Sequence, residues 1–145
     1  MKKNSKTKRV FATVLSLILM LSILAPTALA TEERNEGYGG RFLRISIFCI
    51  DLSIATSGLS SSYSDIVLTY SSDKAELIMD LQQLKSGVWT TIKSWNTSGS
   101  GTVYLDKDWY VVSGYSYRVY TTAKVYNSSG TLLETAYATS NSVFY

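Results

Sequence analysis

Residues 115–125 read YSYRVYTTAKV, and this stretch decides the fold class. Every second residue, starting from Tyr115, is apolar or a threonine, while mostly polar residues occur between them. An alternation with a period of two is typical of a β-strand that buries one face and exposes the other. We therefore expect a strand here, with its apolar face turned toward a core.

A turn follows this strand at once. Residues 127–130, NSSG, fit a type I turn with Gly130 in the left-handed conformation. Pairing the chain outward from this turn places Glu134 opposite Lys124 on one face and apolar residues opposite each other on the other face. The sequence therefore predicts an antiparallel hairpin in this register.

Similar stretches recur along the chain and are separated by turn-forming residues about every 8–12 positions. Strand character covers residues 43–54, 66–70, 75–81, 88–95 and 103–111. Together with the hairpin above, these stretches predict an all-β protein of about seven antiparallel strands.

Three local expectations go with these strands. The alternation in the first strand slips by one position near residues 48–51, which predicts a β-bulge or break there. Gly87 favours a tight hairpin because glycine readily adopts a positive φ. Residues 96–101, NTSGSG, are expected to form a loop.

One spacing carries a resemblance to a known fold. The pattern Val111-x-x-Gly114-x-x-Tyr117-x-Val119 resembles the loop and strand start of fibronectin type III and immunoglobulin-like domains, in which a tyrosine bonds back to the preceding backbone. The resemblance implies that Tyr117 is this corner tyrosine, although Ser113 stands where fibronectin domains usually carry proline. The expected fold is an immunoglobulin- or fibronectin-III-like β-sandwich.

A second resemblance covers roughly residues 52–145. The segments that carry it are Leu81-Gln82-Gln83, Ser86-Gly87-x-Trp89, Ser94-Trp95, Gly114-Tyr115-x-Tyr117-Arg118-Val119 and Tyr126-Asn127-x-x-Gly130-x-x-x-Glu134. Together they resemble a family of small exported proteins of Gram-positive bacteria with a domain of unknown function. This resemblance implies a secreted β-sandwich and supplies no catalytic or binding residues.

Residues 1–30 are typical of a cleavable secretory signal peptide. Five basic residues precede an apolar run at residues 10–24, and Pro26 ends it. Ala28-Leu29-Ala30 matches the small-x-small cleavage pattern, so the mature chain is expected to begin at Thr31. A retained membrane anchor is the alternative, but the run is shorter than the roughly 20 residues that a spanning helix needs.

The chain is therefore expected to have three parts. Residues 1–30 are the signal peptide, residues 31–42 are a polar, flexible lead, and residues 43–145 are one β-sandwich domain. The full chain has 14 basic and 11 acidic residues, whereas residues 31–145 have 9 basic and 11 acidic residues. No cluster of lysine or arginine remains, so we expect no nucleic-acid partner. Membrane contact is expected only through the signal peptide before cleavage.

Cys49 is the only cysteine, which excludes an intramolecular disulfide. We expect it to be a small buried hydrophobic residue on a strand. In an exported protein, a free thiol or an intermolecular bridge are the alternatives.

The residue types exclude several kinds of chemistry. The chain contains no histidine, which excludes Ser-His-Asp and Cys-His catalytic sites and histidine metal sites. No phosphate-binding glycine motif is present, and we expect no cofactor, no metal and no catalytic residue. Asp106 and Asp108 form the only suggestive carboxylate pair, as half of a calcium site or a glycosidase-like pair. We expect them to be a solvated strand edge, because calcium takes 6–8 oxygen ligands.

Aromatic residues are the best indication of a binding surface. Exposed rings can stack on sugars or anchor a protein partner, whereas ordinary sheet packing is the competing explanation. The candidates are Trp89 and Trp95, on a strand expected at a sheet edge, and Tyr104, Tyr110, Tyr120 and Tyr126, in the phase opposite to the expected core.

The sequence therefore predicts a secreted, non-catalytic binding module. Its expected partner is a cell-surface polysaccharide or a protein. A secreted carbohydrate-active enzyme that uses carboxylates and a secreted effector or toxin are the alternatives.

Overall fold

The computed structural model describes residues 42–145, which form eight β-strands and no helix. The predicted signal peptide and the predicted lead up to residue 41 lie outside the described residues. Within the described part of the chain, no helix is long and apolar enough to span a bilayer. The strands are β1 (Ile45–Ile54), β2 (Leu59–Leu68), β3 (Lys74–Lys85), β4 (Val88–Gly99), β5 (Thr102–Tyr110), β6 (Ser116–Tyr126), β7 (Leu132–Thr139) and β8 (Val143–Phe144).

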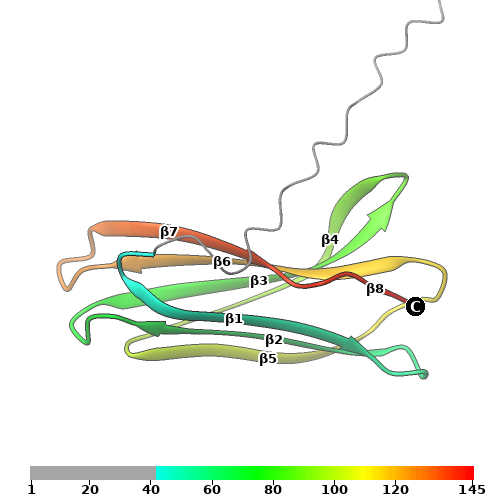
Figure 1. The fold of residues 1–145 in the computed structure, drawn as a ribbon, viewed down its shortest axis with the longest axis horizontal. Coiled ribbons are helices and arrows are strands. Elements are labelled where there is room, and N and C mark those ends of the chain that lie inside the picture. Colours follow the sequence, from blue (N-terminus) through cyan, green and yellow to red (C-terminus); the bar gives the residue numbers. More distant parts are fainter. Residues whose placement is uncertain (1–41) are drawn as a thin grey trace, which may run out of the picture. The chain divides into compact units, whose positions relative to one another are not determined.

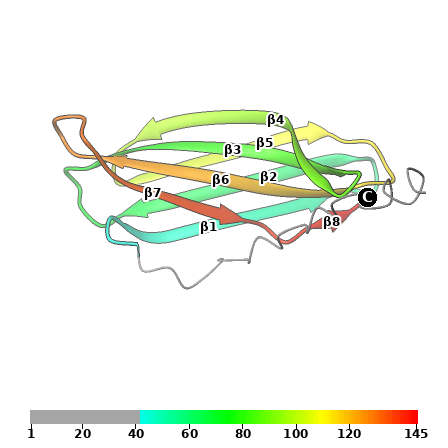
Figure 2. The same cartoon turned by 90° about the horizontal axis from the view of Figure 1, so that it is seen from above.

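The strands form two antiparallel sheets that lie face to face as two layers (Figure 1). One sheet has the order β1-β2-β5, and the other has the order β4-β3-β6-β7, with β8 also paired to β6. The strands of both layers run in similar directions (Figure 2), which is the aligned packing of a β-sandwich. The β2–β3, β4–β5 and β5–β6 connections cross between the layers, as in immunoglobulin-like sandwiches. The predicted all-β sandwich is confirmed.

The core lies between the layers and consists of alternate residues from each strand. β3 and β6 lie in the middle of the larger sheet, and every second residue of both strands is buried over almost the whole length. This confirms the alternation in residues 115–125, except that Tyr115 precedes β6 and is 40% exposed. Fully buried apolar side chains are Ile66, Leu77, Met79, Leu81, Tyr117, Val119, Ala123 and Val125.

β1 is one continuous strand, and its irregularity lies at Ser46 rather than later in the strand, where the sequence predicted it. Phe48 and Ile50 consequently pack against the core, whereas Ile47 is 49% exposed and Cys49 is only half-buried. The predicted bulge position and the predicted burial of Cys49 were wrong. A slip at Ser46 turns the larger apolar side chains inward, which removes more apolar surface from water.

The turn at residues 127–130 forms as predicted, but β7 carries a bulge at Leu133 that shifts the predicted register by one residue. Glu134 therefore does not lie opposite Lys124. Lys124 instead forms an ion pair with Glu76 of β3, with an N–O distance of 3.6 Å. The predicted pair across the last hairpin was wrong, because the bulge turns the Glu134 carboxylate toward other partners.

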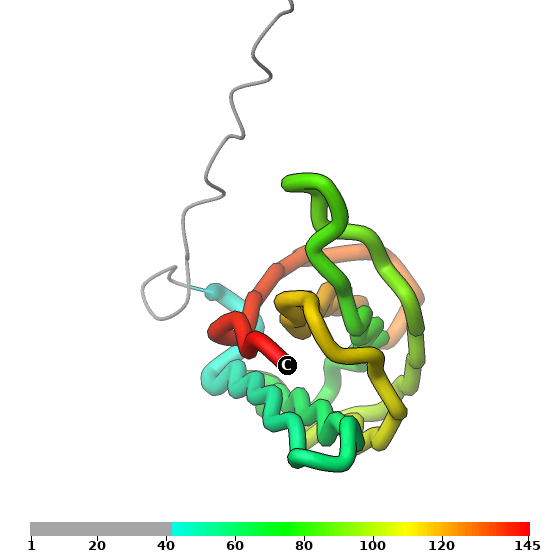
Figure 3. Tube along the Cα trace, turned by 90° about the vertical axis from the view of Figure 1, so that its right-hand side faces the viewer, coloured from blue at the N-terminus to red at the C-terminus, as the bar shows by residue number. Residues whose placement is uncertain are grey.

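The β3–β4 hairpin is tight, as predicted, whereas the connection from β4 to β5 is shorter than predicted. The β3–β4 hairpin turns through Ser86 and Gly87, whose φ values of 50° and 80° are those of a two-residue type I′ turn. This hairpin projects away from the two layers (Figure 3). β4 continues to Gly99, so the predicted loop at residues 96–101 is mostly strand.

β2 begins at Leu59, earlier than the stretch 66–70 in which the sequence predicted a strand. Its first half places Ser60, Ser62 and Ser64 in the core, all fully buried. The Ser60 hydroxyl donates a hydrogen bond of 2.6 Å to the carbonyl oxygen of Trp109. This half of the strand was not predicted, because its inward serines give no apolar alternation in the sequence.

Tyr117 forms the predicted corner between the layers. Its side chain is fully buried, and its hydroxyl donates a hydrogen bond of 2.6 Å to the carbonyl oxygen of Val112. The same hydroxyl accepts a hydrogen bond of 2.8 Å from the Gln83 amide. Burial raises the pKa of the Tyr117 hydroxyl, which keeps it protonated as a donor. Gly114 lies in the loop before Tyr117 and has a φ of 90°, a backbone conformation that favours glycine.

Candidate binding site on the open side of the sandwich

The two long sides of the sandwich differ. On the side that we call the closed side, β1 lies next to β7 and β8. The Glu134 carboxylate on β7 accepts hydrogen bonds from the backbone N–H groups of Leu43 and Arg44, at 3.1 and 2.7 Å. Phe42, the last residue of the predicted lead, packs against Phe48 with ring centroids 5.9 Å apart and contributes to the core. These contacts join the two sheets along this side.

The opposite side, which we call the open side, lies between β4 and β5. Within residues 42–145, β4 pairs only with β3, and β5 pairs only with β2. One edge of each strand therefore carries backbone groups that face no other strand. A groove of about 440 Å³ lies between the two strands, next to the turn that joins them. This volume is in the range of ligand-binding clefts.

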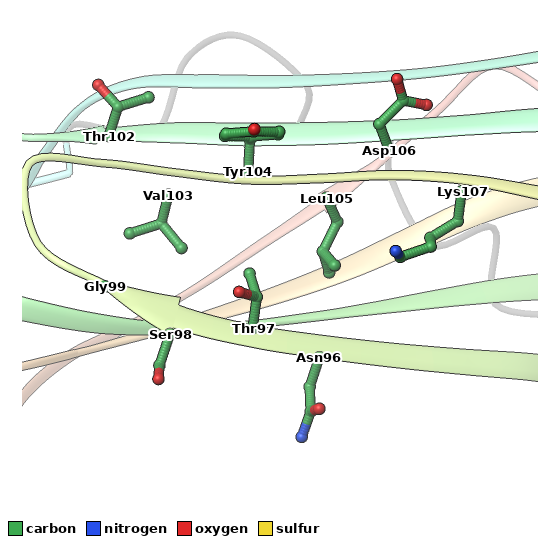
Figure 4. A pocket seen from close by; sticks show the side chains of 10 residues that line it. All are labelled: Asn96, Thr97, Ser98, Gly99, Thr102, Val103, Tyr104, Leu105, Asp106 and Lys107. Atoms are coloured by element: carbon green, nitrogen blue, oxygen red, sulfur yellow. The ribbon is translucent and has the colours of Figure 1, made fainter.

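Side chains from both strands reach into this groove (Figure 4). Val103 and Leu105 of β5 point toward β4, and Thr97 of β4 points toward β5. Lys107 also points into the space between the strands. The groove therefore has an apolar base with a hydroxyl and an ammonium group beside it. The other lining side chains point away from this space: Asn96, Ser98, Thr102, Tyr104 and Asp106.

Further along the same strands, Lys93 of β4 lies between two tryptophans. Its Nζ atom is 4.4 Å from the centroid of the Trp109 ring on β5 and 6.0 Å from that of Trp95 on β4. Trp109 follows Lys107 by two residues and is 41% exposed, and Trp95 precedes Thr97 by two residues. Cation–π attraction holds the ammonium group between the two sheets. Two indole rings and a second lysine therefore lie beyond the groove along the same two strands.

Both lysines occupy inward positions of edge strands. Lys93 lies opposite Leu81, and Lys107 lies opposite Ser62, and both of these partners are fully buried. Inward-pointing charges on edge strands prevent a sheet from pairing with another chain. The open side therefore holds two cations at positions where the alternation would otherwise place core residues.

The outer face of the β1-β2-β5 sheet has the opposite charge. The outward positions of its strands include Asp51, Asp65, Asp106 and Asp108 and contain no lysine or arginine. Tyr63 lies among them, and its pKa is raised by desolvation first and then by Asp65. We call this surface the acidic face.

The six aromatic residues predicted from the sequence do not share one surface. Tyr104 and Tyr110 lie on the acidic face and are 63% and 70% exposed. Trp95 faces inward on the open side and packs against the edge of the core. Of the six predicted residues, only Trp95 lies beside Lys93.

The other three predicted aromatic residues lie on the outer face of the β4-β3-β6-β7 sheet. Trp89 is covered by Arg118, whose guanidinium carbon is 4.4 Å from the ring centroid. Tyr120 stacks on Tyr137 of β7, with centroids 6.0 Å apart, and Tyr126 lies at the far end of β6. The contacts of Trp89 and Tyr120 are side-chain pairs between strands, of the kind expected in any sheet.

Asp106 and Asp108 lie on the acidic face of β5, as the two-residue spacing predicts. Asp108 accepts a hydrogen bond of 2.7 Å from the Ser61 hydroxyl. Glycosidase carboxylates flank a bond from two sides, whereas these two project from the same face of one strand. In the part of the chain that the structure describes, no three His, Cys, Asp or Glu side chains are grouped so that they could hold a metal ion.

The site was not predicted from the sequence, because its members come from two strands that belong to different sheets. Within residues 103–111, Lys107 interrupts the apolar alternation and Trp109 continues it, so neither residue suggests a binding site by itself. A lysine in the inward phase of each of two edge strands is the signal that would have connected them.

Comparison of the chain with protein-family models and with curated proteins found no match in either set.

Proposed function

We propose that this protein is an exported, non-catalytic binding module that holds an extended ligand along its open side. The groove between β4 and β5 carries the proposal, because side chains from both edge strands converge in it. Ligand sites are concave, are largely formed before the ligand arrives, and combine an apolar base with a few polar groups. The Leu105, Thr97 and Lys107 side chains supply this combination.

The two neighbouring indole rings also support a binding role for the open side. Tryptophan offers a large rigid ring at low conformational cost, which makes it a frequent anchor of bound ligands. Trp109 lies beside the groove and is 41% exposed, so part of its surface is accessible to a ligand. A ligand that follows the groove would reach this ring next.

A matched pair of substitutions tests the groove. Thr97→Trp places a bulky ring where the native side chain points into the groove, whereas Ser98→Trp places the same ring on the opposite face of β4. Binding would be measured by calorimetry against soluble neutral and acidic oligosaccharides and against unstructured peptides. We expect Thr97→Trp to weaken binding by at least about tenfold and Ser98→Trp to leave it unchanged.

Equal losses in the two variants, or binding that survives Thr97→Trp, would contradict the groove as the site. The same incubations would be followed for release of reducing sugar. Turnover that disappears in Asp106→Asn would overturn the non-catalytic part of the proposal and favour a carboxylate enzyme.

Export rests on the basic start, the apolar run and the small-residue pattern at residues 28–30. Expression of the full chain in a bacterial host, followed by N-terminal sequencing of protein from the medium, tests it. We expect the sequence to begin at Thr31. A chain that stays in the cell with Met1 intact would contradict export.

A further inference from the structure

We infer that the ligand of the open side is an anionic oligosaccharide, bound with its charged groups at Lys93 and Lys107 and its sugar rings against Trp95 and Trp109. The inference rests on the proposed function, because it names the ligand class of the same groove. The shared chemistry is a sugar ring that bears a carboxylate or phosphate group.

The distribution of charge carries the first step. Two ammonium groups lie on the open side, and Lys107 points into the groove itself. Among residues 42–145, Asp106 is the only carboxylate that lines the groove, and it points away from the space between the strands. A concave site with one sign of charge raises the local concentration of ligands of the opposite sign.

The position of Lys93 carries the second step. A lysine that only protects a strand edge can extend into water, whereas Lys93 Nζ is held 4.4 Å from the Trp109 ring. An anion paired with this ammonium group would therefore lie beside an indole ring. Lys107 and Trp109 repeat this combination on β5, since residues two apart on a strand are about 7 Å apart on the same face.

The lysines at inward positions of β4 and β5 favour a saccharide over a peptide as the ligand. An extended peptide would bind by adding a strand to β4 or β5 through backbone hydrogen bonds. The inward lysines on both strands oppose such pairing. A sugar chain needs no backbone ladder and uses flat ring faces, hydroxyl groups and charges, which are the groups that the open side provides.

A pair of probes that differ only in charge tests the inference. Oligogalacturonate carries a carboxylate on each ring, and its methyl ester has the same rings without the charge. Phosphorylated and dephosphorylated mannan oligosaccharides form the second pair and distinguish phosphate from carboxylate. We expect the charged member of at least one pair to bind about tenfold more tightly or better, and added salt to reduce this difference.

Substitutions then locate the contact. Lys93→Met and Lys107→Met keep most of the side-chain length and remove the charge. Each substitution is expected to weaken binding of the charged probe by about three- to tenfold. Binding of the uncharged probe should not change. Lys124→Met is the matched control, because it removes the same charge from the outer face of the β4-β3-β6-β7 sheet, away from the groove. Thermal unfolding of each variant would confirm that it folds.

The outcomes separate the inference from the proposed function. Equal binding of charged and uncharged probes, still sensitive to Thr97→Trp, overturns the inference and leaves the binding module standing. Polyglutamate that binds as tightly as oligogalacturonate overturns the role of the sugar ring. Equal losses in Lys124→Met and Lys107→Met overturn the assigned contact. Binding of none of the saccharide or peptide probes overturns both proposals.

Discussion

The closed and open sides show two ways in which a two-layer sandwich can treat the edges of its sheets. On the closed side, Glu134 accepts two backbone hydrogen bonds from residues 43–44, and aromatic rings pack beside them. On the open side, β4 and β5 have no backbone partner beyond their own sheets within the described residues, and lysine and tryptophan side chains occupy the space. The difference shows that a covered edge stabilises the fold, whereas an uncovered edge leaves side chains accessible to a ligand.

The open side is held at its ends rather than along its length. A turn at residues 100–101 joins β4 directly to β5 at one end. At the other end, the Tyr117 hydrogen bonds hold the loop through which β5 continues into β6. These two connections keep the groove in place without filling it.

The largest effect is expected at the corner end of the open side. Tyr117→Phe removes one hydroxyl that serves two partners, Val112 and Gln83, and should lower the free energy of unfolding by about 2 kcal/mol. Urea unfolding measures the loss, and hydrogen exchange should accelerate in β5 more than in β1. Tyr110→Phe, at a 70% exposed position, is the control and should have almost no effect.

The same variant gives a dependence on pH. Because the pKa of Tyr117 is raised by burial, its contribution is complete below the unfolded pKa of about 10 and is lost as the pH rises through the folded pKa. The stability difference between the native protein and Tyr117→Phe should therefore shrink above about pH 10. If Tyr117→Phe has the same melting temperature as the native protein at neutral pH, the Tyr117 hydroxyl does not stabilise the corner.

A smaller effect is expected on the closed side. Glu134→Ala removes the acceptor of two N–H groups that water can partly rehydrate, and should cost about 1.5 kcal/mol. Amide exchange at Leu43 and Arg44 should rise more than exchange in β4 or β5. Thr135→Ala, the exposed neighbour on β7, serves as the control. If it destabilises the protein as much as Glu134→Ala, the closed side is not joined by the carboxylate.

The smallest change in stability is expected from the inward lysines. The double variant Lys93→Met/Lys107→Met should lower the free energy of unfolding by about 1 kcal/mol or less, because Lys107 is exposed and Lys93 loses its cation–π contact with Trp109. It should nevertheless self-associate in sedimentation velocity, because uncharged edges can pair with a second copy. Lys85→Met/Lys124→Met is the control with the same charge change. A double variant that stays monomeric at high concentration would show that the lysines do not protect the edges.

The sequence was a good guide where one strand determines its own pattern. β3 and β6 show clear alternation, so their buried residues, such as Met79 and Val119, were correctly expected. The corner at Tyr117 was also predicted, because its signal lies within one short stretch of sequence.

Features that depend on a partner far away in sequence were not predictable. The bulge at Ser46 is favoured by the side chains that it turns toward the opposite sheet, and the bulge at Leu133 directs Glu134 to residues about 90 positions away. Each change of register exchanges inward and outward residues, so one undetected bulge reverses the interpretation of a strand.

The candidate site was only partly predicted for the same reason. Trp95 was selected, but the other five selected aromatic rings lie on the two outer faces. Lys93 and Trp109 come together only because the two layers place β4 beside β5. Exposure of single residues can be estimated from alternation, whereas their assembly into one surface depends on the order of strands in the sheets.

Under the proposed function, the acidic face would constrain the route by which a charged polymer reaches the groove. Four carboxylates at outward positions of β1, β2 and β5 repel a polyanion that approaches over that sheet. Encounters that lead to binding would therefore come from the flank, and a long chain would leave the groove along the strand direction instead of wrapping around the domain. The face that contacts no ligand would thus determine the orientation in which the domain sits on a polymer.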